Sequence, residues 1–300
     1  MKAAVITTFG DPEVLHEADI DVPEPEAGQI RIRIRAIGVN PIEAKIRSGA
    51  FQMPLPAVLG FEFAGVVDAV GERVSDVRPG DRVVGWPDGP VGSYAELTVS
   101  STYVAIPDTV SFEDAAAVLV AADTASRVLA ELAIRTNETL LLHGASGAVG
   151  SVAAQLAVAR GVRVIGTSGA ASRGYVESLG AIAVEYGDGL VERVRAAAPD
   201  GVDAVFDAAG KNALPASINL RGGTDRIVTI ADPTAGGLGV AFSAGTSANR
   251  NLDGVRDAVE RLAERTLSVR IGHTLPLRSA PAAHRLIESG HPGGKVLLVP

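Results

Sequence analysis

The strongest constraint on the fold is a glycine-rich stretch that directly follows an apolar run. Residues 139–143 read Thr-Leu-Leu-Leu-His, glycines follow at Gly144, Gly147 and Gly150, and residues 151–160 have a helical pattern that stops before Gly161. An apolar run without polar alternation is typical of a strand buried on both faces. Glycines at this spacing permit a tight turn and close packing of a helix on a strand. We therefore predict a strand, a turn and a helix in succession.

A turn of this kind leaves backbone N–H groups and the positive end of a helix dipole beside one another. A second apolar stretch at residues 163–167 supplies the next strand of a βαβ unit. The simpler alternative is an ordinary strand–helix turn that happens to be rich in glycine. The βαβ context favours a dinucleotide pyrophosphate site, whose predicted residues are Gly144, Ala145, Ser146, Gly147, Ala148, Val149 and Gly150.

The end of the second strand indicates which nicotinamide cofactor fits. NAD sites carry an Asp or Glu roughly 20 residues past the glycines, where it binds the ribose 2′-hydroxyl. Here residues 167–173 contain no acid and instead include Thr167, Ser168 and Arg173. Hydroxyls and a guanidinium suit a 2′-phosphate, which a carboxylate would repel. The sequence predicts NADPH rather than NADH, although Arg173 alone is equally well explained as a solvated helix residue.

Composition narrows the class of protein. The 300 residues are 47% hydrophobic, include no cysteine and carry a formal net charge of −8. No run of 18 apolar residues is free of charges or turn residues, so we expect neither a membrane span nor an export signal. The acidic balance and the lack of a basic tract argue against nucleic acid and anionic membranes as partners. We expect a globular cytoplasmic protein.

The first third of the chain has the pattern of short strands. Residues 30–35 alternate Ile and Arg strictly, which predicts a half-buried strand with a solvated arginine face, and this strand leads to Asn40 and Pro41. Further short apolar segments, at residues 1–7, 82–85 and 93–99, are separated by glycine and proline turns. This spacing is typical of a compact all-β unit.

The pattern changes near Ser111. Residues 111–114 resemble a capped helix start, and alanine-rich helical sequence continues to Leu132. Strands and helices then alternate through residues 204–210 and 226–230, an amphipathic helix is expected over residues 251–267, and a strand closes the chain at residues 295–299. The alternation predicts an α/β fold with a doubly wound parallel sheet, the Rossmann arrangement.

Several motifs together resemble the quinone oxidoreductase branch of the medium-chain dehydrogenase/reductase superfamily. They are Gly38-Val39-Asn40-Pro41, Lys45-Ile46-Arg47-Ser48-Gly49, residues 55–60, residues 77–83, Ser93-Tyr94-Ala95-Glu96, the glycine stretch and Gly293-Gly294-Lys295-Val296. The resemblance implies a discontinuous GroES-like catalytic domain, residues 1–118 and 272–300, beside a Rossmann NADP-binding domain, residues 119–271, with the cofactor in the cleft between them. It also implies a homodimer, in which residues 240–243 pair two Rossmann sheets at an edge strand.

Zinc-dependent members of the superfamily carry a cysteine where this chain has Asn40 and a histidine where it has Phe61. Asparagine is a poor zinc ligand and phenylalanine is none. The histidines at positions 16, 143, 273, 284 and 291 include no i,i+4 pair, and we interpret them as structural or solvated. We therefore predict no metal site, and alcohol dehydrogenation is not expected without a Lewis acid.

The resemblance also assigns roles to residues. It places Asn40 near the nicotinamide, where its amide is positioned to donate a hydrogen bond to the substrate oxygen or the ribose, and Thr124 on the nicotinamide side. It places Ser168, Arg173 and Tyr186 at the 2′-phosphate and adenine ribose. The remaining predicted contacts are Thr167, Ile230, Phe242 and Lys295 at the cofactor and Phe51 and Phe61 in the substrate pocket.

A proton must follow the hydride, and Lys45 and Tyr94 are the candidates besides solvent. Lys45 is equally explained as a surface lysine, and Tyr94 as a strand aromatic whose hydroxyl has a structural partner.

Three functions remain open at the level of sequence. The first is an NADPH-dependent, zinc-independent oxidoreductase that reduces a quinone. The second is an enoyl or enone reductase of the same fold, and the third is a protein that binds NADPH as a sensor without turnover.

Overall fold

The computed structural model describes residues 1–290 and 292–300. The chain divides into two compact units, unit 1 with residues 1–120 and 256–300 and unit 2 with residues 121–255. The predicted domain limits followed residues 118 and 271, so the second boundary between the units comes earlier than the sequence placed it. His291 lies outside the described residues.

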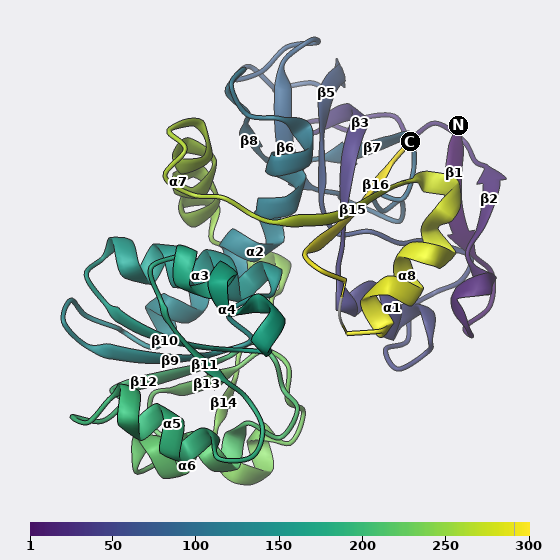
Figure 1. The fold of residues 1–300 in the computed structure, drawn as a ribbon. Helices are drawn as coiled ribbons and strands as arrows, with labels where there is room; N and C mark the ends of the chain where they lie inside the picture. The colour runs from purple at the N-terminus through teal and green to yellow at the C-terminus, as the bar shows by residue number, and fades with distance from the viewer. Residues whose placement is uncertain (291) are drawn as a thin grey trace. The chain divides into compact units, whose positions relative to one another are not determined.

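Unit 2 contains a six-stranded parallel sheet in the order β11-β10-β9-β12-β13-β14, coloured teal to green in Figure 1. Its strands are β9 (Thr139–His143), β10 (Arg163–Ser168), β11 (Ile182–Glu185), β12 (Ala204–Asp207), β13 (Ile227–Thr229) and β14 (Ala241–Phe242). The crossover helices are α3 (Ala148–Ala159), α4 (Arg173–Ser178), α5 (Leu190–Ala197) and α6 (Leu214–Arg221). The chain enters at β9, builds outward to β11, and returns to the other side at β12. This reversal is the topological switch of a doubly wound sheet, as predicted.

The central strands of this sheet are buried on both faces. Leu140, Leu141 and Leu142 of β9 and Val205 and Phe206 of β12 are all 0% exposed. Complete burial explains why the sequence shows a continuous apolar run rather than an alternation.

Unit 1 contains two sheets. A three-stranded sheet has the order β2-β1-β4, and a seven-stranded sheet has the order β15-β16-β3-β5-β6-β8, with β7 paired to β3. The strands are β1 (Lys2–Ile6), β2 (His16–Asp19), β3 (Ile30–Val39), β4 (Ala57–Val58), β5 (Phe63–Val70), β6 (Arg82–Trp86), β7 (Leu97–Ser100), β8 (Thr102–Ala105), β15 (Ile271–Pro276) and β16 (Lys295–Val299). Within this unit the C-terminal strand β16 lies beside β3, as Figure 1 shows.

Strand β3 confirms the alternation read from the sequence. Ile30 and Ile32 are 0% exposed, whereas the alternate residues Arg31 and Arg33 lie on the polar face, where both form ion pairs with Asp68. The period of two therefore separates a core face from a charged face.

The expectation that the first third of the chain is all-β was wrong, because it holds helix α1 (Pro41–Arg47). Unit 1 also holds helix α8 (Ala280–Glu288) from the C-terminal part of the chain. In α1 the buried side includes Glu43 and Arg47 beside Ala44 and Ile46. Charged residues on the buried side conceal the apolar stripe by which a helix is recognised in a sequence.

The two longest predicted helices are present with altered ends. Helix α2 spans Phe112–Glu131 and is capped as expected, since the Asp114 N–H donates to Ser111 Oγ at 3.0 Å. Helix α7 spans Leu252–Ala263, and the chain turns at Arg265, whose φ of 59° is left-handed. Strand β7 begins only at Leu97, because residues 93–96 follow a separate path, with backbone hydrogen bonds to Gly60, Leu59, Ala4 and Lys2. Among the described residues no helix has the length and hydropathy needed to span a membrane.

Candidate active site

The glycine-rich turn between β9 and α3 requires glycine at its ends. Gly144 has a φ of +74°, a left-handed conformation that glycine adopts at little cost. A Cβ on Gly150 would lie only 2.1 Å from the carbonyl oxygen of Gly144, whereas one on Gly147 would lie 3.3 Å from the same oxygen. The backbone of α3 thus approaches the turn so closely that position 150 has no room for a side chain.

The start of α3 presents backbone donors. The first helical hydrogen bond of the turn runs from Ser151 N to Gly147 O at 2.8 Å, so the N–H groups of Ala148, Val149 and Gly150 precede it. Within the described chain, Gly147 provides no side-chain cap for these groups. Three N–H groups at the positive end of a helix dipole match the needs of a pyrophosphate.

Thr167 holds the turn in place. Its hydroxyl accepts a hydrogen bond from Gly144 N at 3.2 Å and lies 3.4 Å from His143 Nδ1, while His143 Nε2 lies 3.0 Å from Ser217 Oγ. Burial lowers the pKa of His143 to about 4, so this imidazole is neutral and bridges two hydroxyls. His143 is therefore structural, as interpreted, and the Thr167 hydroxyl contacts the turn itself.

The predicted 2′-phosphate residues gather at the ends of β10 and β11. Ser168 ends β10, and its carbonyl accepts a hydrogen bond from the backbone N–H of Tyr186 at 3.3 Å. The Tyr186 side chain is 52% exposed, and a Cβ on Gly169 would lie 3.3 Å from its hydroxyl. Arg173 begins α4 and forms an exposed ion pair with Glu177 at 2.9 Å. The backbone brings Ser168 and Tyr186 together, and Arg173 follows five residues after Ser168.

Three other predicted cofactor residues also belong to unit 2. Thr124 is buried on α2, Ile230 follows β13 and is half-buried, and Phe242 lies on edge strand β14 with 49% of its surface exposed. The loop after β12 is held by Asp207, which accepts hydrogen bonds from Gly210 N and from the hydroxyl of the β13 residue Thr229. Sequence reasoning missed this carboxylate, although a polar residue at the end of an apolar strand is a recognisable signal.

In unit 1, Asn40 is the centre of a buried polar cluster. Its Nδ2 donates to Glu62 Oε1 at 2.9 Å and to Glu43 Oε1 at 3.2 Å, and its Oδ1 accepts from Lys295 Nζ at 2.6 Å. The Glu62 carboxylate only accepts and the Lys295 ammonium only donates, so these two partners fix the orientation of the amide. Both Nδ2 hydrogens therefore have protein partners, and the predicted donation from Asn40 to a substrate or ribose would require one of them to be released.

The ion pair of the cluster joins Lys295 to Glu62. Lys295 Nζ lies 2.6 Å from Glu62 Oε1, with side-chain exposures of 4% and 0%, and Glu62 Oε2 accepts the Val120 N–H at 2.8 Å. Glu43 adds a second carboxyl, and burial raises its pKa to about 7. Two carboxyls beside one ammonium leave an excess negative charge when both are ionised, so the cluster favours retention of a proton on Glu43.

Sequence reasoning missed Glu43 and Glu62. Glu43 stands three residues after Asn40, and its Oε2 accepts the Asn40 backbone N–H at 2.9 Å, as in a capping box. That spacing was a usable signal. No local signal marked Glu62, because only the fold brings it against Lys295. Its carboxyl fills the space beside Gly38, where a Cβ would lie 2.1 Å from Glu62 Oε1.

The remaining predicted residues lie in unit 1, where the Phe51 backbone N–H donates to the Lys45 carbonyl at 3.3 Å. Lys45 is exposed on α1, and Phe51 and Phe61 are 53% and 40% exposed. Tyr94 is fully buried, its hydroxyl lies 3.1 Å from His284 Nε2, and burial raises its pKa well above the usual value. These surroundings favour the structural interpretation of Tyr94 and leave Lys45 accessible to solvent.

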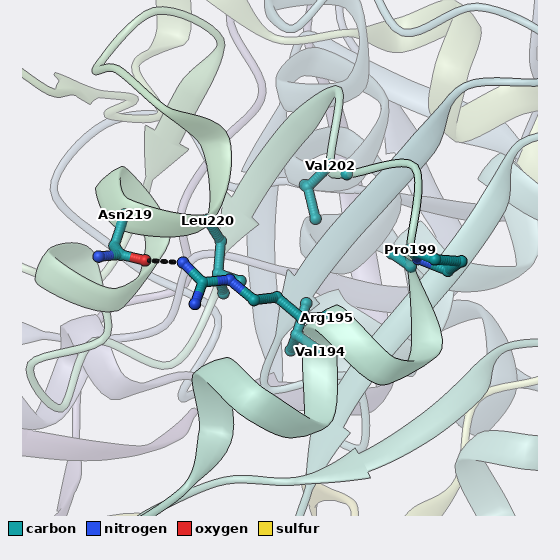
Figure 2. Close-up of a pocket in the computed structure, with 8 residues that line it drawn as sticks. Val194, Arg195, Pro199, Val202, Asn219 and Leu220 are labelled. Atoms are coloured by element: carbon teal, nitrogen blue, oxygen red, sulfur yellow. Dashed lines mark hydrogen bonds between the residues drawn. The ribbon is translucent and has the colours of Figure 1, made fainter.

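A pocket of about 270 Å³ lies elsewhere in unit 2. It is lined by residues of α5, α6 and the loop before β12, and Arg195 donates to Asn219 across it at 2.8 Å (Figure 2). None of the predicted site residues lines this pocket, which lies near the start of β12, whereas the glycine turn lies at the strand ends. In the described residues no three His, Cys, Asp or Glu side chains form a group suited to a metal ion.

Two known families match different parts of the chain. Residues 26–111 match the family described as alcohol dehydrogenase GroES-like domain, and residues 179–298 match the family described as zinc-binding dehydrogenase. A GroES-like domain and a parallel dinucleotide-binding sheet are the two parts of the fold predicted from the sequence.

Individual relatives are quinone oxidoreductases. A quinone oxidoreductase of Pseudomonas aeruginosa is 32% identical over 100% of this chain and 99% of its own length. A mouse quinone oxidoreductase is 41% identical over 56% of this chain, a match that spans only 53% of that protein. The structure of Escherichia coli quinone oxidoreductase complexed with NADPH has a TM-score of 0.89 at 26% identity and covers both chains completely. The chain therefore belongs to the quinone oxidoreductase branch of the medium-chain dehydrogenase/reductase superfamily.

Proposed function

We propose that this protein is an NADPH-dependent oxidoreductase that transfers a hydride to a quinone without zinc. The observation that carries the proposal is the glycine turn, where position 150 has no room for a side chain and three N–H groups begin α3. An enzyme of the same branch and fold binds NADPH. Ser168 and Tyr186 lie together at the adjoining strand ends, where no acidic residue follows Ser168 before Arg173.

The donor set supports independence from zinc. Phe61 has no ligating atom, and the Asn40 amide oxygen and one Glu62 oxygen already contact the Lys295 ammonium. A zinc ion in their place would have to displace a buried ammonium and would find neither thiolate nor imidazole ligands in this cluster. These residues do not fit a zinc ion.

The cofactor supplies the hydride when it is bound, and the chain supplies position and charge. We propose that the α3 N–H groups hold the pyrophosphate and that Ser168, Arg173 and Tyr186 hold the 2′-phosphate and its ribose. Within the described residues Lys295 Nζ donates to Asn40 and Glu62, and we propose that its third N–H serves the cofactor or the substrate oxygen. Thr124, Ile230 and Phe242 complete the proposed nicotinamide surroundings.

The acceptor we propose is a quinone, with Phe51 and Phe61 as the apolar wall of its pocket. A reduced quinone needs a proton, for which exposed Lys45 and solvent are better placed than buried Tyr94. We also retain the expectations of a homodimer and of a cytoplasmic location, with neither nucleic acid nor membrane as partner. An enone is the alternative acceptor, and both classes offer a conjugated carbonyl.

The proposal is tested by titration of cofactor fluorescence with NADPH and NADH in the wild type and in Arg173→Ala. We expect the wild type to prefer NADPH strongly and the variant to lose much of that preference. Equal affinities in the wild type would contradict the 2′-phosphate assignment, and no binding of either cofactor would contradict the enzyme itself. Turnover with matched panels of quinones and enones then identifies the acceptor class.

A further inference from the structure

The turn after β11, residues 185–187, is held by a side chain that sequence reasoning did not single out. Arg193 of α5 donates from Nε to Glu185 O at 2.9 Å and from one terminal nitrogen to Tyr186 O at 3.4 Å and to Gly187 O at 3.3 Å. Three successive carbonyls thus converge on one guanidinium. A planar fork with five donors is suited to such a set, because it fixes the carbonyls in one arrangement.

This turn carries Tyr186 and is joined to the end of β10. Ser168 and Glu185 are paired in the parallel ladder, and the Tyr186 N–H donates to Ser168 O. Arg193 therefore fixes the backbone on which Tyr186 projects beside Ser168, and it does so from the neighbouring helix. Tyr186 itself is 52% exposed, so its position depends on the backbone more than on packing.

Arg193 also differs from Arg173 in its charge balance. Arg173 forms an ion pair with Glu177, whereas in the described residues Arg193 has only carbonyl partners and no carboxylate within ion-pair distance. Its second terminal nitrogen has no acceptor among the hydrogen bonds of the described chain. The guanidinium therefore places one positive charge at the Tyr186 backbone and offsets part of the negative charge of Glu185, Asp188 and Glu192.

We propose that Arg193 is a specificity-determining residue for the cofactor 2′-phosphate, because it positions the Tyr186 turn and adds a positive charge to a turn that otherwise carries only carboxylates. The inference rests on the proposed NADPH function, and it adds a residue of α5 to the strand-end residues already assigned. Arg193 acts through the position of Tyr186 and through the electrostatic effect of its own charge, so it is a positioning residue rather than a catalytic one.

The chain offers a matched control two residues further along the same helix. Arg195 has the same charge, but its guanidinium donates to Asn219 Oδ1 at 2.8 Å on the pocket side of α5 (Figure 2). Arg195→Gln removes one positive charge from unit 2 without touching the carbonyls of residues 185–187. It thereby separates a general loss of charge from a local effect.

The test compares 2′,5′-ADP with 5′-AMP, and NADPH with NADH, by calorimetric titration of wild type, Arg193→Gln, Arg193→Lys and Arg195→Gln. For Arg193→Gln we expect roughly tenfold weaker binding of the two ligands that carry a 2′-phosphate and less than about twofold change for the other two. Arg193→Lys retains the charge without the fork and is expected to recover part of the preference, and Arg195→Gln to match the wild type.

If Arg193→Gln weakened the binding of all four ligands equally, the role of Arg193 would be merely structural and the inference would be overturned. The inference would also be overturned if Arg193→Gln discriminated between the ligands as the wild type does, or if Arg195→Gln had the same effect as Arg193→Gln. Thermal melting of each variant identifies a folding failure. If Arg193→Gln fails to fold, Arg193→Lys decides the question by the ratio of its affinities for NADPH and NADH. If the wild type itself binds neither NADPH nor 2′,5′-ADP, the proposed function fails instead, so the two failures are distinguishable.

Discussion

At the scale of single residues, the Asn40 cluster shows what sequence reasoning could and could not provide. The motif around Asn40 and the absence of zinc ligands were readable directly. The partners of Asn40 were not, because Glu62 and Lys295 are 22 and 255 positions away and meet it only in the folded sheet. A lone polar residue can be selected from a sequence, but whether its hydrogen-bonding groups are already occupied depends on long-range contacts.

Glu43 gives a prediction about pH. Burial disfavours the carboxylate and raises the pKa of Glu43 from its ordinary value of 4.5 to about 7 in the fold. A carboxyl whose pKa is raised by folding contributes its full stabilisation at a pH below its pKa in the unfolded chain. This contribution is lost as the pH rises from 4.5 through 7. The loss is on the order of 3 kcal/mol at 1.36 kcal/mol per pKa unit.

The corresponding measurement is urea unfolding between pH 4.5 and 8 in wild type and Glu43→Gln. The unfolding free energy of the wild type minus that of the variant should fall as the pH rises. The readout is this trend with pH, so it does not depend on how stable the variant is at any one pH. A difference that stays constant across the range would contradict the assigned titration.

The buried ion pair gives a second prediction at this scale. Lys295→Met leaves Glu62 charged and fully buried, which should cost about 3–5 kcal/mol of unfolding free energy. Adding Glu62→Gln removes the uncompensated charge, so the double variant should recover part of that loss. Denaturant midpoints of the two single variants and the double variant measure the coupling, and strictly additive losses would refute it.

At the scale of elements, the strands and the glycine turn were predictable because local patterns determine them. The apolar run of β9 indicates a strand that is buried on both faces, and the alternation in β3 indicates a strand that is buried on one face. Helix α1 was not recognised, because Glu43 and Arg47 stand on its buried side, and α7 was predicted too long because a left-handed residue at Arg265 has no local signal. The missed details are those set by tertiary partners.

The glycine turn supplies a matched pair of substitutions. Gly150→Ala places a methyl 2.1 Å from the Gly144 oxygen, and overpacking of this kind should weaken NADPH binding by about tenfold or more. Gly147→Ala meets the same oxygen at 3.3 Å with a φ of −75°, so it should change binding by no more than about threefold. Fluorescence titration compares them. Equal effects of the two methyls would show that close packing of α3 on the turn does not form the cofactor site.

At the scale of the whole molecule, edge strand β14 bears on assembly. It ends the sheet of unit 2, spans only Ala241–Phe242, and both side chains are exposed. An edge strand with an exposed apolar side chain favours pairing with a second copy. We expect sedimentation equilibrium to give twice the chain mass of 30.7 kDa. Ala241→Asp, which would set like charges against each other across such an edge, should shift the mass toward the monomer. A monomeric wild type at micromolar concentration would rule out this interface.

The central claim is hydride transfer from NADPH to a quinone without a metal. The most direct measurement is NADPH oxidation with a soluble benzoquinone, repeated after dialysis against a zinc chelator and again with NADH. We expect turnover that is unchanged by the chelator and much faster with NADPH than with NADH, and no reduction of NADP⁺ by a primary alcohol. Turnover that disappears with the chelator and returns with zinc would show that hydride transfer depends on a metal.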